Sequence, residues 1–121
     1  KEIVRATVES VAYQTHDLFE AMKNDGLRPK IIKVDGGMVK NNWFSQFLAD
    51  VVDVKVLRPK VDETTALGAA FMAGLQIGVY KSLKDISNNW QVDRTFHPRM
   101  KSSNRKNLIK GWDRAIKKTL S

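Results

Sequence analysis

The sequence contains no cysteine among its 121 residues. Disulfide bonds, thiolate zinc sites, iron–sulfur clusters and thiol nucleophiles are therefore excluded. A chain without cysteine is consistent with a reducing compartment, and we expect a cytoplasmic protein.

The sequence also lacks a hydrophobic run that could cross a membrane. The longest run, residues 66–75, contains two glycines and is far shorter than the roughly 20 residues that a spanning helix needs. No basic segment followed by an apolar one opens the chain, so we expect neither a secretory leader nor a membrane partner. The first residue is Lys1 rather than methionine, which indicates a processed start or a piece of a longer protein.

What the sequence does contain is typical of one folded domain, with 42% hydrophobic and 28% charged residues. The formal net charge of +8 is concentrated at one end. Residues 1–90 carry 12 Lys and Arg against 11 Asp and Glu, whereas residues 91–121 carry 9 against 2. This basic end leaves open a small nucleic-acid-binding or partner-docking module, although a solvated helix face explains it equally well.

Helical periodicity and β-branched runs alternate along residues 1–79. The spacing predicts helices over residues 3–24 and 42–52, and a third helix from Thr64 or Thr65 to about residue 77. Short strands are predicted over residues 30–34 and 54–57. This order predicts an α/β core with parallel strands covered by helices. The faces of the first two helices that are expected to be buried comprise Ile3, Val4, Val8, Val11, Ala12, Thr15, Leu18, Phe19 and Met22, then Trp43, Phe44, Phe47, Leu48 and Val51.

Two strands make an unusually small sheet, so the pattern favours the second half of an α/β domain whose first strands are missing. Residues 80–102 predict irregular structure, and residues 103–120 a basic amphipathic helix with Trp112 on its apolar face. The third helix contains Gly68 and Gly74, although each glycine costs about 1 kcal/mol relative to alanine. Its small residues predict that another backbone or a ligand comes close and that the helix lies tightly against the sheet.

The strongest candidate for a binding site is the segment between the first strand and the second helix, residues 35–42 (DGGMVKNN). Gly36 and Gly37 let the backbone approach a ligand at the carboxyl end of a strand. Asn41 offers a donor and an acceptor that suit a purine edge, and it or Asn42 can also cap the helix. Spacing alone favours an ordinary turn with a glycine at positive φ. The segment is not a Walker A loop, because Lys40 stands at the wrong offset.

No metal site or catalytic group can be assigned from the residues alone. His16 and His97 are far apart in sequence and lack ligand-like spacing. The carboxylates of the first helix form no recognisable acid–base pair.

Taken together, these segments resemble the FGGY carbohydrate kinases, and among them the members that phosphorylate glycerol. Residues 5–15 (RATVESVAYQT) are similar to the long helix of the family, residues 35–42 to its adenosine-binding loop, and residues 65–70 (TALGAA) to the helix beside that loop. Residues 96–98 and 111–112 match as well, so the resemblance runs from end to end.

The resemblance implies an actin-like ATPase fold, in which this chain supplies the C-terminal half of a ribonuclease-H-like domain. Residues 1–79 would form its core, and residues 80–121 an irregular segment and the terminal helix. The implied reaction transfers the γ-phosphoryl group of ATP to glycerol, giving glycerol 3-phosphate, with Mg²⁺, in a homo-oligomer without a nucleic-acid partner.

For the site, the resemblance implies nucleotide contacts from Gly37 and Asn41, with Gly36 as their neighbour in the loop. It assigns no catalytic or metal-binding residue here. The catalytic aspartate and the glycerol pocket would belong to the missing N-terminal part of the same enzyme. We therefore expect residues 1–121 to be inactive on their own.

Overall fold

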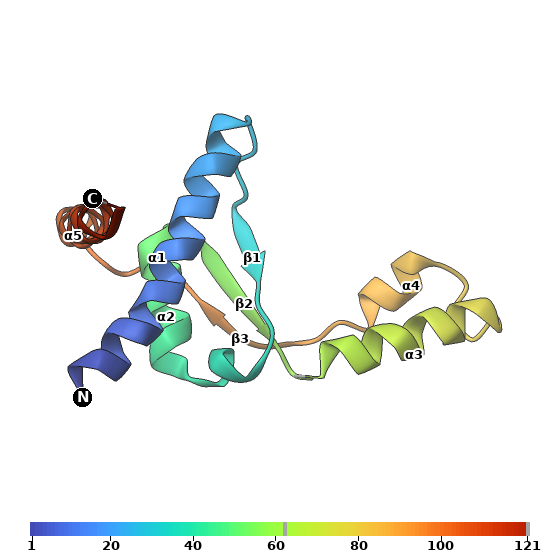
Figure 1. Cartoon of the computed structure of the whole chain (residues 1–121). Coiled ribbons are helices and arrows are strands. Elements are labelled where there is room, and N and C mark those ends of the chain that lie inside the picture. The colour runs from blue at the N-terminus through green and yellow to red at the C-terminus, as the bar shows by residue number, and fades with distance from the viewer. Residues whose placement is uncertain (62, 121) are drawn as a thin grey trace.

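The structure is a computed structural model that describes residues 1–61 and 63–120 (Figure 1). It contains helices, strands and one short 3-10 helix, η1. In chain order these are α1 (Glu2–Asn24), β1 (Ile31–Lys33), η1 (Gly37–Lys40), α2 (Asn42–Val52), β2 (Lys55–Pro59), α3 (Thr64–Gln76), α4 (Leu83–Asn88), β3 (Val92–Phe96) and α5 (Ser102–Leu120). The predicted helices and strands of residues 1–79 are all present, within a few residues of the expected bounds.

The sheet is mixed rather than parallel, and its strand order is β1-β2-β3. β1 and β2 are parallel, with Ile31 opposite Lys55. β3 runs antiparallel to β2, with Phe96 opposite Val56. The prediction of parallel strands is therefore correct for the first pair and wrong for β3.

The segment of residues 80–102 is more regular than the sequence predicted, because it contains both α4 and β3. Ser82 caps α4, since its hydroxyl oxygen accepts a hydrogen bond from the backbone N–H of Asp85 at 3.1 Å. β3 has the sequence VDRTF, in which two charged residues hide the pattern of a strand. The extended conformation of β3 depends on its pairing with β2, and the residues of β2 are distant in the sequence.

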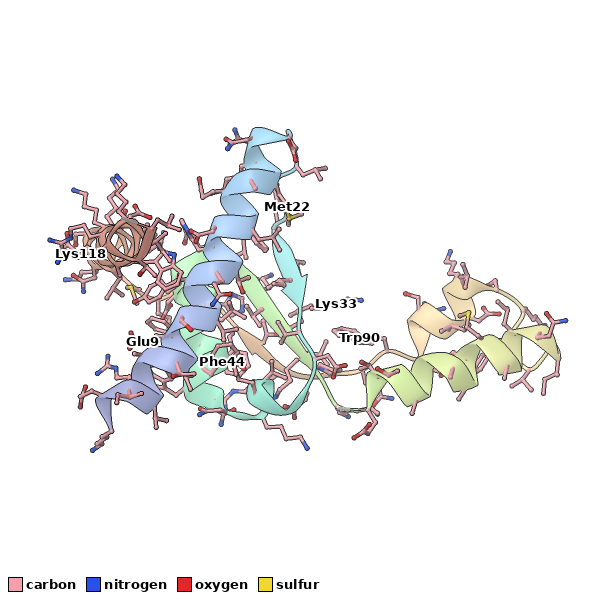
Figure 2. The ribbon with its side chains drawn as sticks, in the orientation of Figure 1. Glu9, Met22, Lys33, Phe44, Trp90 and Lys118 are labelled. Carbon is pink, nitrogen blue, oxygen red and sulfur yellow. The ribbon has the colours of Figure 1, made fainter. Side chains whose placement is uncertain are left out.

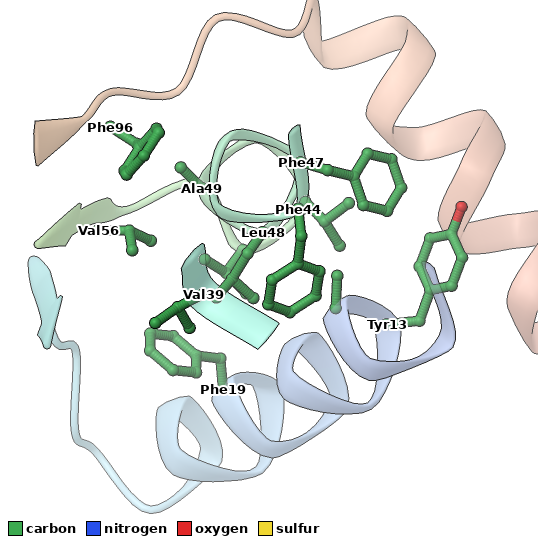
Figure 3. Packing of buried hydrophobic residues seen from close by; sticks show 12 residues of the cluster. Tyr13, Phe19, Val39, Phe44, Phe47, Leu48, Ala49, Val56 and Phe96 are labelled. Carbon is green, nitrogen blue, oxygen red and sulfur yellow. The ribbon is translucent and has the colours of Figure 1, made fainter. Parts of the chain in front are cut away.

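The hydrophobic core lies between α1, α2 and the sheet, and α2 supplies half of its residues (Figure 3). Phe44 is buried at its centre, and Phe47 meets the ring of Tyr13 edge to face with 5.7 Å between the ring centroids. Four residues of the predicted apolar faces are exposed instead: Ile3 at 82%, Val4 at 68%, Leu18 at 59% and Trp43 at 47%. The buried apolar residues are Ala12, Tyr13, Phe19, Val39, Phe44, Phe47, Leu48, Ala49, Val51, Val52, Val56 and Phe96.

α5 is attached to α1 and α2 by polar contacts. The Asp50 carboxylate accepts the backbone N–H of Arg99 at 2.6 Å and that of Met100 at 3.1 Å. The Arg105 guanidinium donates to the Asp50 carbonyl at 2.9 Å. The Trp112 indole donates to an Asp17 carboxylate oxygen at 2.7 Å. α5 therefore turns Trp112 toward the core, as its periodicity predicted.

α3 and α4 form an arm that projects away from the sheet (Figure 1). Only Gly74 of α3 is buried, so the prediction that this helix lies tightly against the sheet is wrong. At the base of the arm, Lys33 of β1 points toward Trp90 (Figure 2), with its ammonium nitrogen 3.9 Å from the ring centroid. Within the arm, the rings of Phe71 and Tyr80 meet edge to face at 5.5 Å.

The two glycines of α3 have different surroundings. A Cβ added at Gly74 would lie 2.9 Å from the Tyr80 ring, whereas one added at Gly68 would meet no atom within 4 Å. Among the described residues, the predicted close approach of another backbone is therefore absent at both glycines: Gly74 meets a side chain, and Gly68 meets no protein atom.

Alanine substitutions at these glycines should have different effects. Gly68→Ala is expected to stabilise α3 by up to about 1 kcal/mol, because alanine is the better helix former and nothing blocks its methyl group. That gain corresponds to about fivefold greater amide hydrogen-exchange protection in α3 of the 121-residue chain. The matched Gly74→Ala variant should show no gain, because the Tyr80 ring must move. Lower protection in Gly68→Ala than in the parent chain would contradict this account.

Candidate functional site

The predicted binding loop leaves β1 and enters α2 through η1. Gly36 has φ +96° and ψ 172°, a conformation that L-residues with side chains rarely adopt. The predicted glycine at positive φ is thus Gly36. A Cβ at either Gly36 or Gly37 would meet no atom within 4 Å. The backbone at both positions is therefore open to an approaching molecule.

Asn41 caps α2 with its side-chain oxygen, and its side-chain amide nitrogen is not used by the cap. Its side-chain oxygen accepts hydrogen bonds from the backbone N–H groups of Trp43 at 2.9 Å and Phe44 at 3.3 Å. Its side-chain amide nitrogen has no hydrogen-bond partner among the described residues. The cap fixes the orientation of the amide, so the nitrogen is a preoriented donor.

A shallow cavity of about 340 Å³, wide open to solvent, lies beside Asn41, between the first turns of α1 and the start of α2. Its walls combine apolar groups with two cations. The exposed ring of Trp43 stacks on Phe47, with 5.1 Å between their centroids. The lining residues are Lys1, Val4, Arg5, Val8, Asn41 and Trp43.

Arg5 is held at this cavity by a ladder of side chains along α1. Its guanidinium donates to Glu9 at 2.6 Å, and the Tyr13 hydroxyl donates to the other oxygen of Glu9 at 3.4 Å. The hydrogen bond to Glu9 and the charge of that carboxylate raise the pKa of Arg5. Burial, and then Glu9, raise the pKa of Tyr13 to about 12. At neutral pH the Arg5 guanidinium at the cavity is therefore charged and paired with Glu9, and Tyr13 is neutral.

A second cavity, of about 330 Å³, lies on another side of the loop, toward β2 and β3. The loop is also joined to the start of α3, because the Thr64 hydroxyl donates to the Asp35 carboxylate. The cavity lining is mostly charged and comprises Asp35, Val39, Lys40, Arg58, Pro59, Lys60 and Asp93.

Gly36, Gly37 and Asn41 thus lie on one continuous loop that is bordered by both cavities. Sequence reasoning missed Val4 and Trp43 as cavity residues, because it assigned both to buried helix faces. Their positions could have indicated exposure, because each lies within the first turn of its helix, where fewer neighbouring residues cover an apolar side chain.

The described residues provide no other recognisable reactive site. Within residues 1–61 and 63–120, no group of three or more His, Cys, Asp or Glu side chains is placed to hold a metal ion. His16 lies 3.6 Å from Asp17 and 3.7 Å from Glu20, distant from the loop in sequence. None of the described helices is both long and apolar enough to cross a membrane.

Comparison with family models and known sequences gives a consistent result. Residues 1–77 match the model of the FGGY family of carbohydrate kinases, C-terminal domain. The whole chain is 52% identical to a glycerol kinase of Ectopseudomonas mendocina and 51% identical to glycerol kinase 1 of Pseudomonas aeruginosa. It spans 25% and 24% of the length of these two relatives, so it corresponds to about a quarter of each.

Solved structures share the same arrangement. The chain superimposes on a crystal structure of Plasmodium falciparum glycerol kinase with ADP, with a TM-score of 0.83 and 34% identity over 98% of this chain and 24% of that one. Gluconate kinase from Lactobacillus acidophilus gives a TM-score of 0.72 at 23% identity, over 91% of this chain and 22% of that one. The second likeness concerns the fold alone.

Proposed function

Because this chain belongs to the FGGY family of carbohydrate kinases and matches its C-terminal domain, we propose that it is the adenosine-binding part of an ATP-dependent glycerol kinase. The observation that carries the proposal is the identity of about half to glycerol kinases over the full chain. The complete enzyme would transfer the γ-phosphoryl group of ATP to glycerol and release glycerol 3-phosphate and ADP. We further propose a cytoplasmic homo-oligomer, which the cysteine-free composition and the family resemblance support.

The fold proposal follows from the sheet. The chain would form the C-terminal half of a ribonuclease-H-like domain of actin-like ATPase type. Within the described residues, β1 pairs with β2 and its other edge carries no strand. A strand edge in this state accepts further strands through its backbone N–H and C=O groups. The remaining strands of the domain would add there.

The loop and the cavity beside Asn41 suit the adenosine part of the nucleotide. An adenine ring has two apolar faces, which Val4, Val8 and the ring of Trp43 can cover. Its edge carries acceptor nitrogens, to which the free amide N–H of Asn41 can donate. The open backbone at Gly36 and Gly37 leaves room for the ribose and the first phosphate.

The described residues do not provide a site for Mg²⁺, which this class of reaction requires. They contain no suitable cluster of ligands, so the ion would depend on the nucleotide phosphates and on other parts of the complete enzyme. Phosphoryl transfer depends mainly on positioning and charge stabilisation. The part played by this chain is binding: it anchors the end of ATP remote from the transferred group, and such binding energy can serve to orient the reacting end.

The basic end of the chain does not favour a nucleic-acid-binding module. Stacking on bases requires exposed aromatic rings. The ring of Trp112 is stacked on Tyr13 at 5.4 Å and its indole N–H is bonded to Asp17. The positive charges of α5 are better explained as a solvated helix face.

The variant Asn41→Asp in the complete kinase tests the proposed site. Aspartate keeps the side-chain oxygen that caps α2 but loses the amide donor, so helix stability should be preserved. Loss of one neutral hydrogen bond is worth about 0.5–1.5 kcal/mol, so the KM for ATP should rise by up to about tenfold. The KM for glycerol should stay the same.

The comparison variants are Asn41→Ala, which removes the cap and the donor together, and Asn104→Asp on the exposed face of α5. Asn41→Ala should raise the KM for ATP and also lower the melting temperature. Asn104→Asp should change neither quantity. An unchanged KM for ATP in Asn41→Asp would remove Asn41 from the nucleotide site.

A further inference from the structure

Arg58 of β2 bonds to the proposed nucleotide loop at three acceptors. Its Nη1 donates to the carbonyl oxygens of Val39 at 2.9 Å and Lys40 at 3.2 Å, and to the side-chain oxygen of Asn42 at 3.0 Å. These acceptors flank Asn41 on both sides along the chain. The Arg58 side chain is only 16% exposed, and its hydrogen bond to Val39 is partly buried, whereas those to Lys40 and Asn42 lie at the surface.

The carbonyl groups that Arg58 meets belong to η1, the short helix that turns the chain toward α2. Short 3-10 turns have poor hydrogen-bond geometry, and partly buried backbone carbonyls need partners. Val39 accepts a further hydrogen bond from the hydroxyl of Ser45 at 2.9 Å, and Ser45 is fully buried. Arg58 and Ser45 therefore fix the end of the loop at which Asn41 stands.

Asp93 of β3 holds Arg58 from the opposite side. One oxygen of its carboxylate lies 2.7 Å from Nε and 2.6 Å from Nη2 of Arg58. The pairing of β2 with β3 places Arg58 opposite Arg94 and Pro59 opposite Val92, which leaves Asp93 as an extra residue in a β-bulge. Bulges redirect side chains, and this one aims a carboxylate at the guanidinium.

We infer that Arg58 is a positioning residue for nucleotide binding, and that Asp93 acts by orienting Arg58. The inference rests on the proposed function of the loop. The guanidinium directs Nε and Nη2 at Asp93 while the two N–H groups of Nη1 are shared among the three loop acceptors, and an ammonium group cannot reproduce this geometry. The clamp connects β2 and β3 to the loop and keeps the free amide of Asn41 directed at its cavity.

The test uses the complete kinase and measures the KM for ATP and for glycerol, kcat and the melting temperature. Arg58→Met and Arg58→Lys should both raise the KM for ATP by about tenfold, because the charge-assisted hydrogen bonds to the loop are lost. The KM for glycerol should change by less than about twofold. Arg94→Met is the matched control on β3, since its guanidinium packs 5.3 Å from the Phe96 ring and donates to no loop atom in the described residues.

Asp93→Asn is the second variant, because it keeps Arg58 and the sheet while weakening their connection. It should raise the KM for ATP in the same direction but by less, about threefold. If Asp93 acts only through Arg58, the double variant Arg58→Met with Asp93→Asn should resemble Arg58→Met alone. Additive effects of the two changes would overturn the role given to Asp93.

If Arg58 only stabilised the fold and did not position the loop, a different result would be expected. The melting temperature would fall while both KM values stayed the same, and that result would overturn the inference. Asn41→Asp, measured in the same assay, separates the inference from its premise. If Asn41→Asp raises the KM for ATP and both Arg58 variants leave it unchanged, the loop binds nucleotide and the inference about Arg58 is wrong. If none of the three changes it, the proposed site is wrong and the inference falls with it.

Discussion

Phe19→Ala is expected to lower the free energy of unfolding of the 121-residue chain by about 3–5 kcal/mol, the usual cost of emptying a buried phenylalanine site. Phe19 is 6% exposed and belongs to the core cluster between α1, α2 and the sheet. A small domain has about 5–15 kcal/mol of stability in total. The loss is therefore a large part of the total stability, and the variant should unfold at a clearly lower urea concentration than the parent chain.

Leu18→Ala is the matched control, because Leu18 is the neighbouring residue on the same helix and is 59% exposed. It should change the free energy of unfolding by no more than about 0.5 kcal/mol. Urea denaturation followed by circular dichroism measures both variants. Similar losses in the two variants would show that both residues are buried, as the helical periodicity predicted and as the structure contradicts.

Local signals in the sequence identified the helices well. The spacing of apolar residues located α2, and an asparagine before it indicated the cap that Asn41 provides. The glycine pair predicted a turn at positive φ, which occurs at Gly36. Each of these features depends on residues within a few positions of one another, so the sequence carries them directly.

Features that depend on distant residues were missed. β3 is held by pairing with β2, and its own sequence contains Asp93 and Arg94. The Arg58–Asp93 contact joins residues 35 positions apart. The openness around Gly68 depends on where α3 lies in space, which composition does not specify. Helical periodicity also predicted that Leu18 is buried, whereas it is exposed, because the apolar face of a helix can be wider than the surface that covers it.

The binding loop was the part of the site most accessible to sequence reasoning, and the cavity beside it was the least. Gly36, Gly37 and Asn41 lie within six consecutive residues. The cavity requires α1 to cross the start of α2, which brings Val4 close to Trp43. No spacing rule relates two helices separated by a strand, so this contact had to come from the fold.

The 121-residue chain by itself is expected to show no measurable phosphorylation of glycerol. Its residues correspond to about a quarter of the glycerol kinases that it matches. The described residues contain a surface suited to adenosine and no ligand cluster for a metal ion. Binding the remote end of ATP positions a substrate, but transfer also needs groups that orient glycerol and stabilise the charge on the γ-phosphate.

The measurement is ADP release by the purified chain with glycerol and Mg·ATP, beside the complete kinase at equal concentration. Light scattering gives the mass of the same sample, because the open edge of β1 should make the chain associate with itself. Isothermal titration with ADP should show weak binding, and Asn41→Asp should weaken it further. Such binding without turnover would show that the chain keeps its adenosine site while lacking catalytic groups. Turnover of even about 1 s⁻¹, the low end for ordinary enzymes, would mean that these residues hold a complete active site, and the division of labour proposed for this domain would be wrong.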